Sequence, residues 1–303
     1  MNKFGNLFDL QGLSLDRLRN FLMVADAGTL AKAAPGDSNR QSLFSRQIKE
    51  LEGFFGVPLT SRVGRQIEIT EEGHGLAKMI RQQFREMSDF RDAMAGRATT
   101  LKIGSQGSVI EWLLIPRLDS LRASLGNVVL EMEQMRSRDT VAAVIDGRLD
   151  LGIVREDALP PEMKRWKLGQ VGYAVFAAKD LWKGCRTPEE LLAKAPIAEL
   201  HPGGQFASRL SEWMQSKKLH PKTVARTSSF TDLAKIAKSG VAAVVLPDLA
   251  SVDFSDQQFR HEPIKALKSR QLALVANMRN SERLGLASKF ENLTHVILSK
   301  VEC

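Results

Sequence analysis

The stretch RQSLFSRQIKEL, residues 40–51, places the strongest constraint on what the N-terminal part of the chain can form. Its apolar residues recur about every 3.6 positions, which predicts a helix with one buried stripe made of Leu43, Phe44, Ile48 and Leu51. The opposite face carries cations, amides and hydroxyls, which can hydrogen-bond to base edges in a DNA major groove or to phosphates. An ordinary amphipathic helix with a solvated face would look the same, so the flanking segments must decide.

Those flanking segments predict a winged helix-turn-helix. Ser14 can cap a first helix that ends at Gly28, and a second, short helix begins at Thr29 and ends at Pro35, because proline cannot continue a helix. After residues 40–51, the run VPLTSRVGRQIEITEEG has two short β-prone stretches around a glycine, the pattern of a hairpin. Two helices, a polar-faced helix and a basic hairpin in this order are typical of a winged helix-turn-helix.

A long helix without proline is predicted from residue 71 to about residue 97. Its apolar residues recur at steps of three or four, close to a heptad seam: Leu76, Ile80, Phe84, Met87, Phe90 and Met94. Packing on its own domain would explain part of this stripe. We favour pairing with the same helix of a second copy, because an isolated helix of this length needs a surface to cover its apolar face.

Beyond residue 98 strands and helices alternate, which predicts an α/β domain with parallel sheets and crossover helices. The pattern forms two blocks and ends in one helix over residues 281–298. Two such lobes, joined by chain crossings near residues 171–176 and 270–276, would enclose a cleft.

Composition excludes some classes of protein and says little about others. The net charge is +8, yet residues 1–100 carry 14 Lys and Arg against 12 Asp and Glu, so only the five cations within residues 40–65 favour DNA binding. Two distant cysteines and no Cys/His spacing predict neither a zinc site nor a disulfide framework. No apolar run reaches the length of a membrane span, and no nucleophile, zinc-protease or P-loop motif is present. We therefore expect a cytoplasmic protein without a cofactor, and not an enzyme.

The segment of residues 28–73, GTLAKAA…RQSLFSRQIKELEGFFGVPLTSRVGRQIEITEEG, resembles the N-terminal winged helix-turn-helix of LysR-type transcriptional regulators. RLDLGIV (148–154) and SSFTDLAKIAKSGVAAVVLP (228–247) are similar to that family's effector domain, which has a periplasmic-binding-protein architecture. The resemblance implies a DNA-binding domain over 14–70, a linker helix over 71–97 and an effector domain over 98–303. Its lobe I would span about 98–172 and 273–303, and lobe II about 173–272.

The resemblance also implies partners: double-stranded promoter DNA with a partly palindromic site, further copies of the chain in a dimer or tetramer, and a small anionic metabolite between the lobes. The residues expected to contact bases or phosphates are Thr29, Lys32, Arg40, Gln41, Ser42, Ser45, Arg46, Lys49, Arg62 and Arg65. Among them Arg46 is the residue that we expect to make a bidentate guanine contact or a firm phosphate contact.

Candidate effector-binding residues lie at strand ends and strand-to-helix junctions, where helix starts offer free N–H donors. They are Ser105, Gln106, Ser108, Gln134, Arg155, Gly203, Gly204, Thr227 and Ser229. For each single residue, helix capping is the commoner role of serine and threonine at such a junction. For the set, a ligand site is the interpretation that we favour.

A second class of function remains open from sequence. The chain could be a small-solute-binding protein whose N-terminal helices serve only for assembly, without sequence-specific DNA binding. The basic hairpin beside Arg46 favours the regulator, because assembly alone does not require it.

Overall fold

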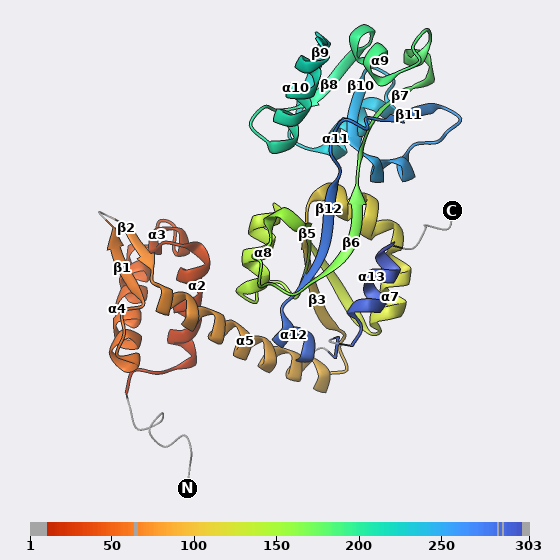
Figure 1. Cartoon of the computed structure of the whole chain (residues 1–303). Coiled ribbons are helices and arrows are strands. Elements are labelled where there is room, and N and C mark those ends of the chain that lie inside the picture. The colour runs from red at the N-terminus through yellow and green to blue at the C-terminus, as the bar shows by residue number, and fades with distance from the viewer. Residues whose placement is uncertain (1–10, 64–65, 284, 287, 299–303) are drawn as a thin grey trace. The chain divides into compact units, whose positions relative to one another are not determined.

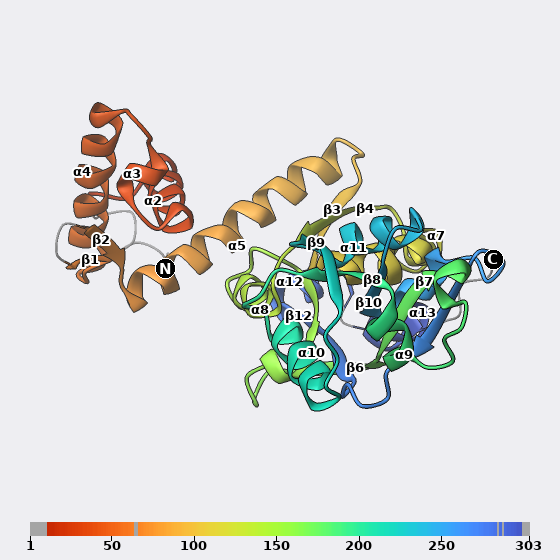
Figure 2. The same ribbon diagram turned by 90° about the horizontal axis from the view of Figure 1, so that it is seen from above.

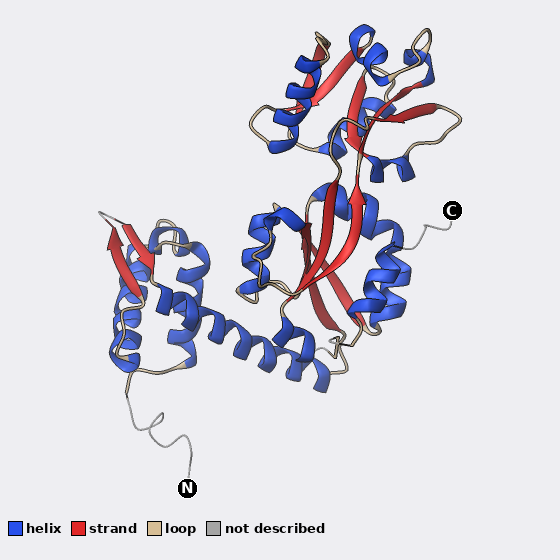
Figure 3. Cartoon of the chain, viewed as in Figure 1, coloured by secondary structure: helices blue, strands red, loops and turns tan. Residues whose placement is uncertain are grey.

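The protein is described here by a computed structural model that covers residues 11–63, 66–283, 285–286 and 288–298. The chain forms two compact units, one with residues up to Thr99 together with Asp146–Arg148, and one with the rest (Figure 1). The first unit is mainly helical with one two-stranded hairpin, whereas strands and helices alternate in the second (Figure 3). Each unit is described by itself below.

The first unit has the helices and the hairpin that the sequence predicts. Its elements are α2 (Leu15–Ala27), α3 (Leu30–Ala33), α4 (Ser38–Phe55), β1 (Thr60–Val63), β2 (Gln66–Ile69) and α5 (Glu71–Met94). All four helices begin at a side chain that accepts a hydrogen bond from the N–H three residues on, namely Ser14, Thr29, Asp37 and Thr70. Gly28 and Gly56 end α2 and α4 with φ of 78° and 70°, a left-handed backbone that glycine adopts without steric cost.

The core of the first unit lies between α2, α4, the hairpin and the start of α5. Its fully buried side chains are Phe21, Val24, Ala34, Phe44, Ile48, Leu51, Leu59, Leu76, Ala77 and Ile80. The second half of α5 has no such cover, because Met87, Phe90 and Met94 are exposed, with relative accessibilities of 49%, 68% and 71%. The stripe predicted along this helix is therefore buried only in its first half.

The second unit consists of two lobes, each built on a five-stranded sheet. The first sheet has the order β4-β3-β5-β12-β6. Its strands are β3 (Thr99–Ser105), β4 (Val128–Gln134), β5 (Leu151–Arg155), β6 (Arg165–Val171) and β12 (Arg270–Ala276). One face of this sheet packs against α8 (Ser137–Ile145), and the other against α7 (Leu118–Leu125) and α13 (Phe290–Leu298).

The second sheet has the order β11-β7-β10-β8-β9. Its strands are β7 (Tyr173–Ala178), β8 (Pro196–Leu200), β9 (Lys222–Thr227), β10 (Ala243–Pro247) and β11 (Phe259–Pro263). Side chains alternate across the sheet, so that Tyr173 and Val175 face α9 (Pro188–Lys194) and α10 (Gln205–Ser216), whereas Ala174 and Phe176 face α11 (Phe230–Lys238). Figure 2 shows α10 and α11 on opposite sides of β8 and β10.

Two expectations about this unit were wrong. Both sheets are mixed rather than parallel, because β12 pairs antiparallel with β5 and β7 pairs antiparallel with β10. The strands β6 and β11 were not predicted, and they pair antiparallel with β12 and β7. Their sequences, RWKLGQV and FRHEP, are too polar to signal a buried strand. The single C-terminal helix is two helices, α12 (Met278–Arg283) and α13, with Gly285 between them at a φ of 63°.

Trp112 belongs to the first lobe by sequence and is buried in the core of the second. It lies in the π-helical turn η1 (Ile110–Leu114), whose Leu113 and Leu114 join the first lobe's core. Trp112 is part of the second lobe's core, the same hydrophobic cluster that contains Phe176 and Phe254. Its Nε1–H donates to Asp253 Oδ2 at 3.1 Å, an oxygen that also accepts from Lys238 Nζ at 3.0 Å. One side chain thus joins the two lobes.

Candidate DNA-binding surface and interlobe pocket

Helix α4 presents a polar face opposite its buried stripe. Arg40, Ser42, Arg46 and Lys49 are exposed, and Gln41 and Ser45 are half-buried. Phe44, Ile48 and Leu51 hold the other side of the helix in the core. Because the residues alternate between these two faces at the helical period, the exposed cations all point away from the unit's core.

The side chains of this face differ in how firmly they are held. Gln41 Nε2 donates to the carbonyl oxygen of Ala34 at 2.8 Å, so its amide joins α4 to the end of α3. The Arg40 guanidinium lies over the Phe44 ring, 5.3 Å from its centre. Arg46 is 72% exposed, and its Nε lies 3.9 Å from Glu50 Oε1, a weak pairing at a solvated position. Arg46 is therefore free to exchange that partner for a phosphate or a base edge.

The remaining predicted DNA contacts come from α3 and the hairpin. Thr29 is the cap of α3 and accepts from the N–H of Lys32, whose side chain is exposed. Arg62 is exposed on β1. Arg65 lies outside the described residues.

Glu52 ties the hairpin to α4. Its Oε1 accepts hydrogen bonds from the N–H groups of Leu59 and Thr60 at 2.9 and 3.0 Å, and from the Thr60 hydroxyl at 3.0 Å. A groove lies between the two elements, and it is lined by Leu30, Ser45, Ile48, Lys49, Glu52, Thr60, Ser61, Arg62 and Ile67. The cations of α4 and of β1 thus border one shared groove.

A pocket lies between the lobes of the second unit, where the chain crosses from one sheet to the other. Its lining is Gln106, Ser108, Val109, Arg155, Val171, Tyr173, Phe230, Pro247, Leu249, Arg270 and Leu272. Phe230 begins α11, and the other residues come from the carboxyl ends of β3, β5 and β10 and from both crossings, the usual place for a ligand in an α/β sheet. Three of the predicted residues meet here: Gln106, Ser108 and Arg155.

The other predicted effector residues lie outside this lining. Ser105 is fully buried, and its hydroxyl donates to the carbonyl oxygen of Ile153 at 2.7 Å. Gln134 is exposed at the end of β4, next to Gly107, where an added Cβ would lie 2.9 Å from the Gln134 amide. Gly203 and Gly204 are exposed before α10.

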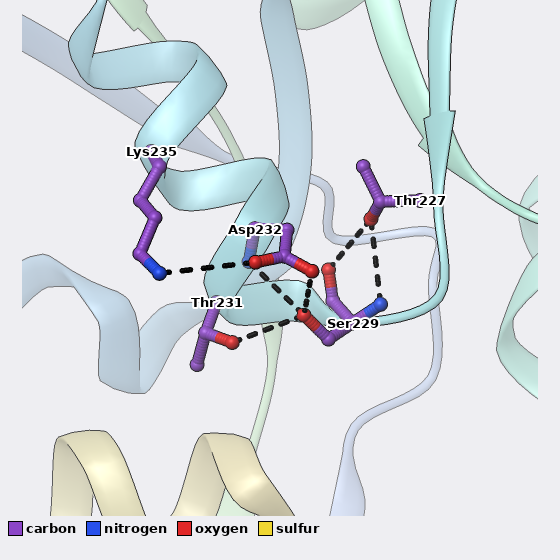
Figure 4. Close-up of polar contacts among 5 residues, drawn as sticks. All are labelled: Thr227, Ser229, Thr231, Asp232 and Lys235. Atoms are coloured by element: carbon purple, nitrogen blue, oxygen red, sulfur yellow. Dashed lines mark hydrogen bonds and ion pairs between the residues drawn. The ribbon is translucent and has the colours of Figure 1, made fainter.

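The hydroxyl of Ser229 caps α11, and the hydroxyl of Thr227 holds the backbone of Ser229 (Figure 4). Thr227 Oγ1 donates to the carbonyl oxygen of Ser229 at 2.9 Å. Ser229 Oγ accepts from the Asp232 N–H at 3.1 Å and donates to Asp232 Oδ2 at 2.8 Å. At this junction the hydrogen bonds are those of a helix cap.

Two polar residues of the pocket, Tyr173 and Arg270, were not among the sequence candidates. Each is the first residue of a strand within one of the two crossings, and neither belongs to a motif that marks it. The Arg270 side chain is 12% exposed, and its Nη1 donates to Gln205 Oε1 at 3.0 Å. Burial raises the pKa of the Tyr173 hydroxyl above its usual value, while the charges of Arg270, Arg209 and Arg155 act in the lowering direction. The hydroxyl is therefore protonated and able to donate at neutral pH.

Replacing Arg270 with glutamine is expected to raise the pKa of Tyr173 further, because the positive charge that stabilises the tyrosinate is removed. Tyr173 is the one tyrosine of the sequence, so the ultraviolet absorbance of tyrosinate reports this group alone in a pH titration. Glutamine at Arg122, which is exposed on α7 and outside the pocket lining, is the control. A Tyr173 pKa that falls in the Arg270 variant would contradict the arrangement.

The same pKa shift of Tyr173 predicts how the free energy of unfolding depends on pH in alkaline solution. Since the folded-state pKa is raised, the stability linked to Tyr173 is present below its unfolded-state pKa and is lost as the pH rises through the folded-state value.

The described residues contain no group of three or more His, Cys, Asp or Glu side chains that could hold a metal ion. Over the same part of the chain, no helix has the length and apolar character needed to cross a membrane.

The chain combines a winged helix-turn-helix that has an exposed cationic helix with a two-lobed α/β unit that has a pocket between its lobes. This combination is that of a DNA-binding regulator with a ligand-binding domain. Residues 15–74 match the bacterial regulatory helix-turn-helix of the lysR family, and residues 95–290 match the LysR substrate binding domain. The chain belongs to the family of LysR-type transcriptional regulators. This confirms the fold class and the regulator function expected from sequence, in preference to the alternative of a solute-binding protein whose N-terminal helices serve only for assembly.

Two relatives that are similar in sequence are also transcriptional or regulatory proteins. The nitrogen assimilation regulatory protein nac of Klebsiella aerogenes is 24% identical over 299 residues, which cover 95% of each chain. The HTH-type transcriptional regulator BenM of Acinetobacter baylyi is 31% identical over 157 residues, which cover 50% of this chain and 51% of that relative.

Solved structures show the same fold. A full-length OxyR variant from Pseudomonas aeruginosa superposes with a TM-score of 0.62 at 21% identity, covering 95% of this chain and 96% of that one. Full-length CbnR, solved in complex with its target DNA, gives a TM-score of 0.56 at 18% identity and covers 93% of this chain and 100% of its own.

Proposed function

We propose that this regulator binds a two-fold-related promoter site as a homo-oligomer, and that a small molecule in the interlobe pocket modulates this binding. The observation that carries the proposal is the exposed cationic face of α4 beside the groove with β1. In this arrangement α4 enters a major groove, where Arg46 reads a base edge or holds a phosphate. Thr29, Lys32, Arg40, Gln41, Ser42, Ser45 and Lys49 surround it, and Arg62 and Arg65 of the hairpin contact the flanking DNA.

The exposed end of α5 supports the oligomer. Met87, Phe90 and Met94 follow one another on one side of the helix and lie in solvent in the single chain. A second copy of α5 would cover them with an equivalent stripe, and two DNA-binding domains would then face a site with two-fold symmetry.

The pocket supports ligand control. Ligand binding between two lobes favours the conformation in which both lobes contact the ligand, and such a population shift is a route by which a ligand alters the DNA contacts of an oligomer. CbnR offers a parallel for the DNA half of the proposal, since its structure was solved with its target DNA.

Selection of bound sequences from a random duplex pool tests the proposal. The wild-type chain is expected to enrich a two-fold-related motif, and Arg46→Ala is expected to weaken binding to that motif about 10- to 100-fold, the range of a lost base or phosphate contact. Anisotropy titrations at one fixed, near-physiological salt concentration give both affinities, because phosphate contacts make DNA affinity strongly salt-dependent.

Arg122→Ala is the matched control, since it removes one exposed positive charge from α7 in the other unit. It should leave the affinity within about twofold of the wild type. Weak binding without a motif, equal in the Arg46 and Arg122 variants, would show that the chain does not read sequence through α4.

A further inference from the structure

Two arginine side chains that line the interlobe pocket are largely shielded from solvent, and one of them has a donor without an acceptor. The side chains of Arg155 and Arg270 are only 17% and 12% exposed. Arg270 Nε is buried, and among the described residues it has no hydrogen-bond partner. A buried N–H donor without an acceptor destabilises the folded state, and more so when the group is charged. The pocket therefore lacks an acceptor that a bound molecule can supply.

One carboxylate of the chain serves both arginines in part. Asp157 Oδ1 accepts from Arg155 Nε at 2.9 Å, and Asp157 Oδ2 lies 3.9 Å from Arg270 Nη1. Asp157 is itself 60% exposed in η3 (Glu156–Ala158), at the edge of the pocket and outside its lining. A carboxylate at this edge can move into solvent at little cost, because water solvates it there.

The rest of the lining fixes the character of the ligand. Gln106, Ser108 and the protonated Tyr173 can donate hydrogen bonds beside the two arginines. The remaining walls are apolar: Val109, Val171, Phe230, Pro247, Leu249 and Leu272. A carboxylate can form a planar, bidentate hydrogen-bonded pair with a guanidinium group, and an apolar body can pack against these walls. An organic carboxylate therefore fits the pocket better than an inorganic anion.

We propose that the pocket binds a small monocarboxylate with an apolar body, and that Asp157 is an internal counter-ion whose place at Arg155 and Arg270 the ligand carboxylate takes. This assignment rests on the proposed ligand control and names its ligand class. Asp157 competes with the ligand for the same donors, so it sets the ligand concentration at which the pocket fills.

The test is calorimetric titration of the full-length chain with defined probes. Benzoate and hexanoate represent the proposed class, benzamide and hexanamide are their uncharged counterparts, and inorganic phosphate represents a purely ionic ligand. The wild type is expected to bind at least one of the carboxylates and neither amide. Asp157→Asn is expected to tighten carboxylate binding about two- to tenfold, because a competing, partly exposed ion pair is removed. Arg270→Gln is expected to weaken it about tenfold or more.

Asp180→Asn is the control, since Asp180 is an exposed carboxylate paired with Lys183 at 2.8 Å outside the pocket. It should leave carboxylate affinity unchanged. The proposal is overturned if Asp157→Asn behaves like Asp180→Asn or binds more weakly, if the amides bind as well as the carboxylates, if phosphate binds better than either carboxylate, or if no carboxylate binds to any variant. DNA binding by the same preparations separates the two proposals: intact motif binding without carboxylate binding refutes the ligand class alone.

Discussion

Replacing Trp112 with alanine is expected to lower the free energy of unfolding of the second unit by about 3–5 kcal/mol, the usual cost of truncating a fully buried tryptophan. Trp112 is 1% exposed and is part of the core of the second lobe, although η1 belongs to the first lobe by sequence. Its loss leaves a cavity in that core and removes the hydrogen bond to Asp253. No other side chain of η1 packs in that core within the described part of the chain.

Urea unfolding followed by tryptophan fluorescence measures this effect, because the remaining tryptophans, Trp166, Trp182 and Trp213, lie in both lobes of the second unit. Trp112→Phe keeps an aromatic ring at this site, and it loses the Nε1–H donor and part of the indole volume. It should cost about 1–2 kcal/mol, less than the alanine variant. An alanine variant with wild-type stability would mean that Trp112 does not join the lobes.

The first unit should respond most strongly to Phe44→Ala. Phe44 is 1% exposed at the centre of a small core, and its truncation is expected to cost about 3–5 kcal/mol. A core of this size supplies little stability beyond that amount, so we expect the unit to unfold and DNA binding to be lost. The Arg40 guanidinium also loses the ring over which it lies.

Two optical signals locate the damage. The described helices of the first unit contribute to far-ultraviolet circular dichroism, whereas every tryptophan of the sequence lies beyond residue 99. Heating the Phe44→Ala variant should therefore show an early loss of helical signal and an unchanged fluorescence transition. Phe44→Leu, which keeps an apolar side chain of similar reach, should retain most of the DNA affinity. Equal loss in both signals would refute independent folding of the first unit.

The N-terminal unit could be predicted in detail because its signals are local. Ser14, Thr29 and Gly28 mark helix ends within a few residues of the turns that they cap, and the helical period of α4 separates core from surface directly. The strands β6 and β11 were not predicted, because their own residues are too polar to indicate a buried strand. Their place in the sheets is fixed by tertiary pairing with β12 and β7.

The pocket could be predicted only in part for the same reason. Arg155 and Arg270 are separated by more than a hundred residues and meet because β5 and β12 pair. Sequence reasoning selected Thr227 and Ser229 for their hydroxyls, yet those hydroxyls are engaged in hydrogen bonds at the start of α11. Which polar groups face the pocket depends on strand register, and register is set by long-range pairing.

The hydrogen bonds of Glu52 limit the spacing of the DNA sites that this protein can bind. Its carboxylate joins the last turns of α4 to the backbone at β1, so the helix and the hairpin are held at one distance from each other. A DNA-binding domain with this fixed spacing cannot adapt to a longer site. In the proposed complex, the base pairs contacted by the helix and those flanked by the hairpin therefore lie a constant number of steps apart. Inserting one base pair between them should turn a good half-site into a poor one, since each step also rotates the groove.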